Sequence, residues 1–69
     1  MGHRVGIIFA GVHSDHRIMS PPWDEEEKAM AELRGIRRQR DAGEEIQRSW
    51  ADVPAGSIIA LFVMDDDAS

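Results

Sequence analysis

The chain has 69 residues and no cysteine, which leaves room for one domain and excludes disulfides and thiolate metal sites. Thirteen acidic side chains against eight basic ones give a formal net charge of −5. Such a body repels nucleic acid and anionic lipid and attracts basic protein surfaces, although the same charge also serves simply to keep a small domain in solution. The composition therefore predicts no direct nucleic-acid partner.

No segment reads as a membrane anchor or an export signal. The longest apolar run, residues 58–64, is far shorter than the roughly 20 residues that cross a bilayer. A basic N-terminus precedes a short apolar run that glycine interrupts, with no small-residue cleavage site after it. Together with the absence of cysteine, this predicts a cytoplasmic protein without a membrane partner.

The first predicted element is a strand over residues 4–12, which is apolar, rich in β-branched residues and bounded by turn formers. Val5, Ile7 and Phe9 share one face of it because side chains alternate along a strand. Residues 13–16 then predict a turn, and residues 17–19 a short second strand that pairs back on the first.

A helix is predicted to begin within residues 20–27 and to run to about Arg40. Ser20 or a neighbour caps it, two prolines preset its first turn, and the carboxylates that follow face the positive end of the helix dipole. An apolar stripe recurs at helical spacing and marks the face toward the core; it comprises Ala29, Met30, Leu33 and Ile36.

A second, short helix is predicted after a break at residues 41–44. Asp41 is in position to cap it, and Glu44 follows three residues later, the spacing of a capping box. Ile46, Trp50 and Val53 lie on one face at helical spacing, and residues 54–56 end the element.

Residues 57–64 form the last predicted strand, which is apolar on both faces, the pattern of a strand covered on both sides. Residues 65–69 read as an acidic C-terminal tail. The fold class predicted for residues 1–64 is a small α+β domain, a two- or three-stranded sheet with two helices packed on one face, in the order strand, short strand, helix, helix, strand. One face of so small a sheet lacks cover within the chain, so either a homodimer or a wrapping helix is expected to supply it.

Residues with catalytic or metal-binding chemistry gather only around the first turn. His13, Asp15 and His16 could ligate a metal, but their spacing matches no standard site. Ser14 between them lacks an oriented base and an oxyanion hole, and the glycines form no phosphate-binding pattern. The sequence therefore predicts no enzyme, no cofactor and no metal, and leaves a small metal-binding subunit as the minor alternative.

The only basic cluster lies in the second half of the first predicted helix. It could contact nucleic-acid phosphates, but cations there also complement the helix dipole; its members are Arg34, Arg37, Arg38 and Arg40. Of the two tryptophans, Trp50 is predicted in the core, and Trp23 is either a core residue or an exposed anchor for a partner.

Clustered carboxylates are the most distinctive feature of the chain. On a helix, neighbouring turns place such groups about 5–6 Å apart, a spacing comparable to that of phosphates along a nucleic-acid strand. They therefore predict a partner-binding surface, against the plainer interpretation of a solvated helix face. The predicted residues are Asp24, Glu25, Glu26, Glu27, Glu32, Asp41, Glu44, Glu45, Asp65, Asp66 and Asp67.

In this profile, which is short, acidic, free of cysteine and rich in carboxylate clusters, the chain resembles small phage-encoded inhibitors, especially anti-CRISPR proteins. The resemblance implies a non-catalytic inhibitor that docks on a basic protein or nucleoprotein complex, such as a CRISPR effector, blocks its target DNA, and acts in the cytoplasm of the host bacterium. The four-arginine cluster departs from a uniformly negative DNA mimic. The alternative is a small structural or regulatory module that acts through an apolar dimer or partner interface.

Overall fold

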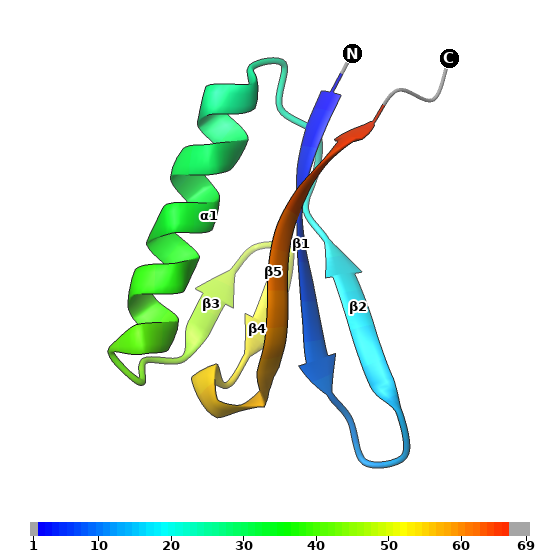
Figure 1. The fold of residues 1–69 in the computed structure, drawn as a ribbon, viewed down its shortest axis with the longest axis vertical. Helices are drawn as coiled ribbons and strands as arrows, with labels where there is room; N and C mark the ends of the chain where they lie inside the picture. The colour runs from blue at the N-terminus through cyan, green and yellow to red at the C-terminus, as the bar shows by residue number, and fades with distance from the viewer. Residues whose placement is uncertain (1, 67–69) are drawn as a thin grey trace.

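The structure, a computed structural model, describes residues 2–66 and shows one helix and two antiparallel sheets (Figure 1). The expected acidic tail falls partly outside these residues, since the structure does not describe residues 67–69. In chain order the elements are β1 (Gly2–Ala10), β2 (Asp15–Met19), α1 (Glu26–Asp41), β3 (Ile46–Arg48), β4 (Ala51–Val53), the 3-10 turn η1 (Ala55–Ser57) and β5 (Ile58–Asp66).

A three-stranded antiparallel sheet in the order β2-β1-β5 forms one layer, and α1 forms the other. Val5 of β1 lies opposite Val63 of β5, and Ile7 lies opposite Leu61 on one side and Ile18 on the other. Residues directly opposite in a sheet share a face, so all five point toward α1. The helix buries Ala29, Leu33 and Ile36 against them. The predicted apolar stripe and the predicted inward face of the first strand are confirmed.

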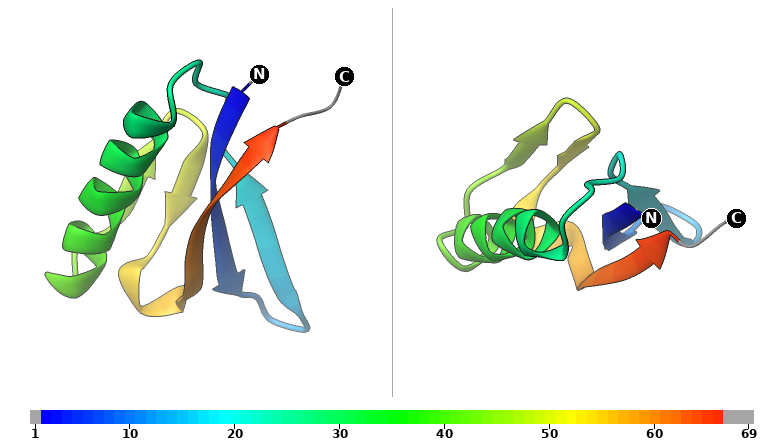
Figure 2. Two further views of the ribbon diagram at one scale, coloured as in Figure 1. Left: turned by 45° about the horizontal axis from the view of Figure 1, so that its top comes forward. Right: turned by 90° about the horizontal axis from the view of Figure 1, so that it is seen from above.

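The predicted second helix is wrong, and with it the fold class of two helices on one sheet. Residues 46–53 form the β3–β4 hairpin, which packs beside α1 on the same side of the three-stranded sheet (Figure 2). Ile46 pairs directly with Val53, and both are fully buried. Their seven-residue spacing imitates two helical turns, but it is equally the spacing of partners across a tight hairpin. Their β-branched side chains favour the strand.

The start of α1 falls within the predicted residues 20–27, but Ser20 has a different role from the one predicted. Ser20 does not cap the helix, which begins only at Glu26. Instead, Ser20 is fully buried; its Oγ accepts a hydrogen bond from the Val5 amide at 2.8 Å and donates to the Pro21 carbonyl at 3.0 Å. The serine continues the pairing of β2 with β1, because a buried backbone amide needs an acceptor.

The end of α1 is set by a glycine, and Asp41, predicted to cap a second helix, is instead the last residue of α1. Gly43 has φ 75°, a left-handed conformation that glycine adopts without strain. Its amide donates to the Arg40 carbonyl and the Glu44 amide donates to the Gln39 carbonyl, the two bonds of a Schellman motif. This termination turns the chain back so that the β3–β4 hairpin can pack beside the helix.

The last strand is covered on one face only. Ile58, Leu61 and Val63 pack against the core, whereas Phe62 and Met64 point to the opposite side of the sheet. β5 also runs on to Asp66, two residues beyond the predicted strand. No element of residues 2–66 covers the second face, which the right-hand view of Figure 2 shows on the side away from α1.

Candidate protein-binding surfaces

The start of α1 and the end of β5 meet at one end of the molecule (Figure 1). His3 joins them: its amide and carbonyl both bond to Trp23, at 2.8 and 2.9 Å, while on its other side it pairs with Asp65 of β5. Trp23 itself is half-buried against the core, so its ring also fixes the loop that leads into α1. The carboxylates gathered there, called the acidic end below, are Asp24, Glu25, Glu26, Glu27 and Asp65.

All side chains of the acidic end are exposed. Asp65 accepts a hydrogen bond from His3 Nδ1 at 2.7 Å and still exposes 72% of its side chain. Among the described side chains, no ion pair neutralises the four carboxylates from Asp24 to Glu27. Glu26 and Glu27 occupy the first turn of α1, where the helix dipole favours negative charge. The cluster is thus compatible with the fold and open to a partner.

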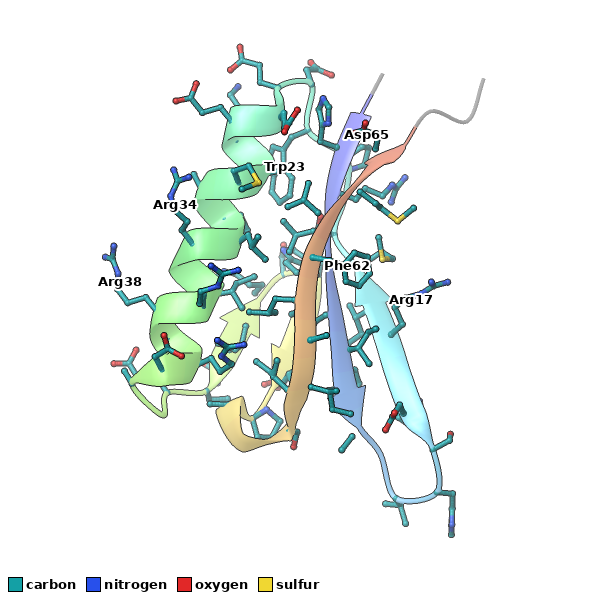
Figure 3. All side chains as sticks on the ribbon, in the orientation of Figure 1. Arg17, Trp23, Arg34, Arg38, Phe62 and Asp65 are labelled. Carbon is teal, nitrogen blue, oxygen red and sulfur yellow. The ribbon has the colours of Figure 1, made fainter. Side chains whose placement is uncertain are left out.

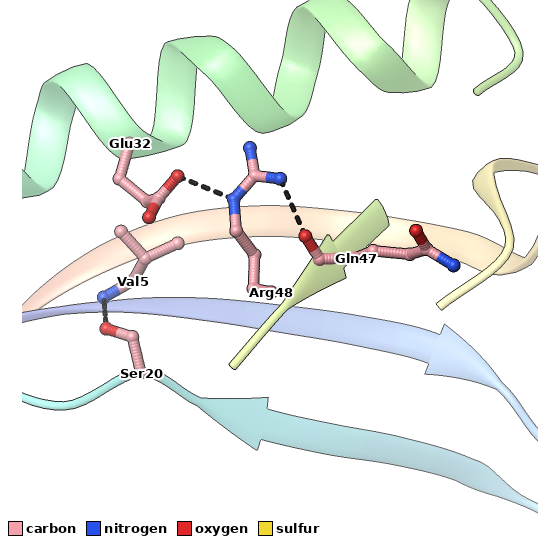
Figure 4. A network of polar contacts seen from close by, with 5 residues as sticks. All are labelled: Val5, Ser20, Glu32, Gln47 and Arg48. Atoms are coloured by element: carbon pink, nitrogen blue, oxygen red, sulfur yellow. Dashed lines mark hydrogen bonds and ion pairs between the residues drawn. The ribbon is translucent and has the colours of Figure 1, made fainter. Parts of the chain in front are cut away.

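Glu32, also predicted to bind a partner, has a structural role instead. Its Oε1 accepts a hydrogen bond from Arg48 Nε at 2.9 Å, and both side chains are only 23% exposed (Figure 4). A second nitrogen of Arg48 donates to the Gln47 carbonyl at 3.1 Å. The pair fastens the β3–β4 hairpin to α1. Glu25 precedes the helix, so Glu25 and Glu32 do not form a row of carboxylates on one helix face.

The other predicted acidic residues lie away from the acidic end. Asp41 is the last residue of α1, and its carboxylate lies 3.3 Å from the Arg40 guanidinium. Glu44 and Glu45 follow in the exposed loop, where the Glu45 carboxylate accepts a hydrogen bond from the side-chain amide of Gln47 at 2.6 Å. Since α1 has 16 residues, its length separates the two groups by about 24 Å. The side chain of Asp66 and the whole of Asp67 lie outside the described part of the structure.

The outer side of α1 is basic. Arg34 and Arg38 point away from the sheet (Figure 3), and Arg37 is exposed as well. None of the three has an ion pair among residues 2–66, while Arg40 is half-buried beside Asp41. The molecule therefore has an acidic end and a basic flank, so a basic partner is attracted to one and repelled by the other.

The residues of the first turn do not assemble into a metal site. His16 packs its ring on Phe9, with centroids 5.5 Å apart, and closes over Gly11. His13 and Asp15 are both exposed. Nowhere among the described side chains do three or more His, Asp or Glu groups gather closely enough to hold a metal ion.

A second surface is the uncovered side of the three-stranded sheet, called the open face below. Its central residues follow from the register, in which Gly6 lies opposite both Phe62 and Met19, and Ile8 lies opposite Ala60. The Phe62 ring lies across Gly6: a Cβ built on Gly6 falls within van der Waals overlap of three ring atoms. Met64 extends the face and is 44% exposed. Glycine within an otherwise β-branched strand is the sequence signal for such a close approach.

No family model, curated protein or solved structure matches this chain. The described residues contain no helix that is both long enough and apolar enough to cross a membrane. The acidic end and the open face are therefore interpreted from their own geometry.

Proposed function

We propose that this protein is a non-catalytic inhibitor that binds a basic, nucleic-acid-binding protein through its acidic end. The observation that supports the proposal is the convergence of exposed carboxylates from α1 and β5, none of the four at the start of α1 being neutralised by a described basic side chain. Following the resemblance to anti-CRISPR proteins, a CRISPR effector in the bacterial cytoplasm is the type of target proposed, and exclusion of its DNA is the effect.

The proposed mechanism is electrostatic competition. A groove that binds nucleic acid carries Lys and Arg side chains for the phosphates, and carboxylates form charge-assisted hydrogen bonds with the same groups. A compact cluster on a folded scaffold also loses little freedom on binding. Because exposed charges are screened over about 8 Å at physiological ionic strength, this contact weakens as salt is added.

The basic flank of α1 determines the approach. Arg34, Arg37 and Arg38 repel a basic groove, so the partner is expected to engage the acidic end and not the side of the helix. The same argument separates the acidic end from Asp41, which lies beside Arg40.

The test compares two variants with the same change in charge. One replaces the acidic end (Glu25→Gln, Glu26→Gln, Glu27→Gln); its matched control replaces the far group (Asp41→Asn, Glu44→Gln, Glu45→Gln). Tagged proteins capture partners from host lysate, the captured complex is identified by mass spectrometry, and its DNA binding is measured with each purified variant. We expect the first variant to lose at least tenfold in inhibition, and the control to retain it. Equal inhibition by both variants would refute the electrostatic mechanism.

A second candidate function is favoured by the open face, which exposes Met64 beside Phe62. A structural or regulatory module that acts through an apolar interface would use this face. In that case the acidic variants retain activity, whereas Met64→Glu abolishes it.

A further inference from the structure

The open face is apolar at its centre and charged only toward its margins. Gly6 and Ile8 from β1, Met19 from β2, and Ala60, Phe62 and Met64 from β5 form a continuous uncharged area. Two sheets of this kind pack face to face about 10 Å apart in β-sandwiches. In residues 2–66 no helix, strand or loop takes that place.

The relief of the open face alternates between large and small residues. Along β1, Gly6 is followed on this face by Ile8; along β5, Ala60 is followed by Phe62. Because the Phe62 ring covers Gly6, the small residue left open on this face is Ala60, which lies beside Ile8 and two residues from Phe62 along β5. Suppose that the strands of a second copy run in the opposite direction and that the two-fold axis passes between the row of Gly6 and Phe62 and the row of Ile8 and Ala60. Phe62 of each copy then faces Ala60 of the other. Ile8 then faces the Phe62 ring that covers Gly6 in the second copy.

Two charges at the margins, Arg4 and Asp15, are related by the same symmetry, whereas Arg17 of each copy faces Met19 of the other. Arg4 stands at one end of β1, level with Met64, and its Nη1 donates to the Ser20 carbonyl at 3.0 Å. Asp15 stands at the other end, level with Ala10. The two levels are six residues apart, about 20 Å along the strand. Antiparallel stacking brings the basic margin of each copy toward the acidic margin of the other.

We propose that two copies of this chain associate through their open faces, with strands antiparallel about a two-fold axis that lies in the interface and crosses the strands. Each copy uses the same surface, so a contact from one residue of the first copy to another residue of the second copy is repeated in the opposite sense, as an isologous interface requires. The two acidic ends then lie at opposite ends of the dimer. Stacking with parallel strands would instead bring them together and add repulsion. The inference uses the same face as the second candidate function and is independent of the acidic end.

The signs of the charges at the margins distinguish a second copy from other occupants. Single-stranded nucleic acid could stack on Phe62 and contact Arg4 and Arg17, but a net charge of −5 opposes its approach. A basic partner is repelled by the same two arginines at the margin. A second copy carries the same net charge and the same two arginines, but its margin also presents Asp15, which antiparallel stacking brings toward Arg4.

The size of the face sets the expected affinity. Three strands are about 14 Å across and nine residues extend about 30 Å, which gives a footprint of roughly 400 Å² per copy. That is about half of a standard interface of about 800 Å² per partner. We therefore expect a dissociation constant in the micromolar range.

The first experiment is sedimentation of the full chain between about 1 and 500 μM. The mass is expected to rise from the 7.7 kDa of one chain toward twice that value. Met64→Glu is expected to weaken association at least tenfold. The matched control, Val12→Glu, introduces the same charge at an apolar residue that is 92% exposed in the β1–β2 turn, and should leave association unchanged. Circular dichroism confirms that both variants are folded.

Cross-linking tests the orientation, since a chain without cysteine accepts single engineered thiols. In antiparallel stacking, two copies of Ala60 lie about 7 Å apart along the strands and two copies of Met64 about 20 Å apart. Ala60→Cys should therefore be linked by a short bismaleimide, and Met64→Cys should not. Equal linking of both would overturn the antiparallel arrangement.

Three further results would overturn the inference. One is a monomer at every concentration. Another is dissociation by Ile59→Glu but not by Met64→Glu, which would indicate pairing along the edge of β5, where Ile59 is displaced by a bulge and 54% exposed. The third is binding of a single-stranded oligonucleotide that Phe62→Ala abolishes. None of these bears on inhibition through the acidic end, so the two proposals fail separately.

Discussion

The two faces of the three-stranded sheet are built from the same strands but differ in what covers them. On one face, Val5 and Ile7 are fully buried under α1 and the β3–β4 hairpin. On the other, Ile8 and Phe62 remain partly exposed and Met64 is 44% exposed. The difference shows that apolar residues on both faces of a strand indicate that both faces favour burial. The helix and hairpin of the same chain need not cover both of them.

The largest expected effect comes from truncating neighbouring isoleucines on the two faces. Ile7→Ala removes a fully buried side chain and should lower the free energy of unfolding by about 2–5 kcal/mol. Ile8→Ala, on the open face, should cost about 1 kcal/mol in the monomer, because less area leaves the core. Urea unfolding at low protein concentration measures both. Equal losses would mean that the two faces are equally buried under those conditions.

The next effect concerns the contact between Gly6 and Phe62. A methyl group at Gly6 overlaps the ring, so Gly6→Ala should force Phe62 outward and destabilise the protein by about 1–3 kcal/mol. The double variant Gly6→Ala with Phe62→Ala tests the cause, since the two changes should be less harmful together than their sum. Strictly additive losses in thermal unfolding would contradict the contact.

The smallest effect concerns the covered side, where Glu32 and Arg48 fasten the hairpin to α1. Glu32→Gln keeps the shape and removes the charge, and should cost about 0.5–1 kcal/mol, as for other partly exposed pairs. The loss should shrink in high salt. Glu27→Gln, at an exposed residue without an ion pair among the described side chains, is the control and should leave stability within about 0.5 kcal/mol.

Sequence patterns predicted β1 and α1 because their apolar residues repeat at one spacing only. The stripe through Leu33 and Ile36 fits a helix, and the alternation around Ile7 fits a strand. Ile46 and Val53 fit two structures equally, and only the tertiary contact with α1 decides between them. Gly43 lies within the break predicted at residues 41–44, and a glycine after a helical stripe predicts the end of the helix.

The candidate site was predicted in part. Asp24 to Glu27 are exposed as a cluster, which their density in the sequence had indicated. Glu32 could not be assigned in this way, because its partner Arg48 is sixteen residues away on another element. Nor could the proximity of Asp65 to the start of α1 be inferred, since it depends on β1 lying between β2 and β5.

The central position of β1 also dictates when the protein can fold during synthesis. β1 leaves the ribosome first, yet its longest partner, β5, is made last, and His3 bonds to a residue 62 positions away. Closing so long a loop is entropically costly and slows folding relative to local contacts. Until β5 emerges, Val5 and Ile7 have only β2 beside them. The nascent chain therefore carries one edge of β1 unpaired until β5 has been made.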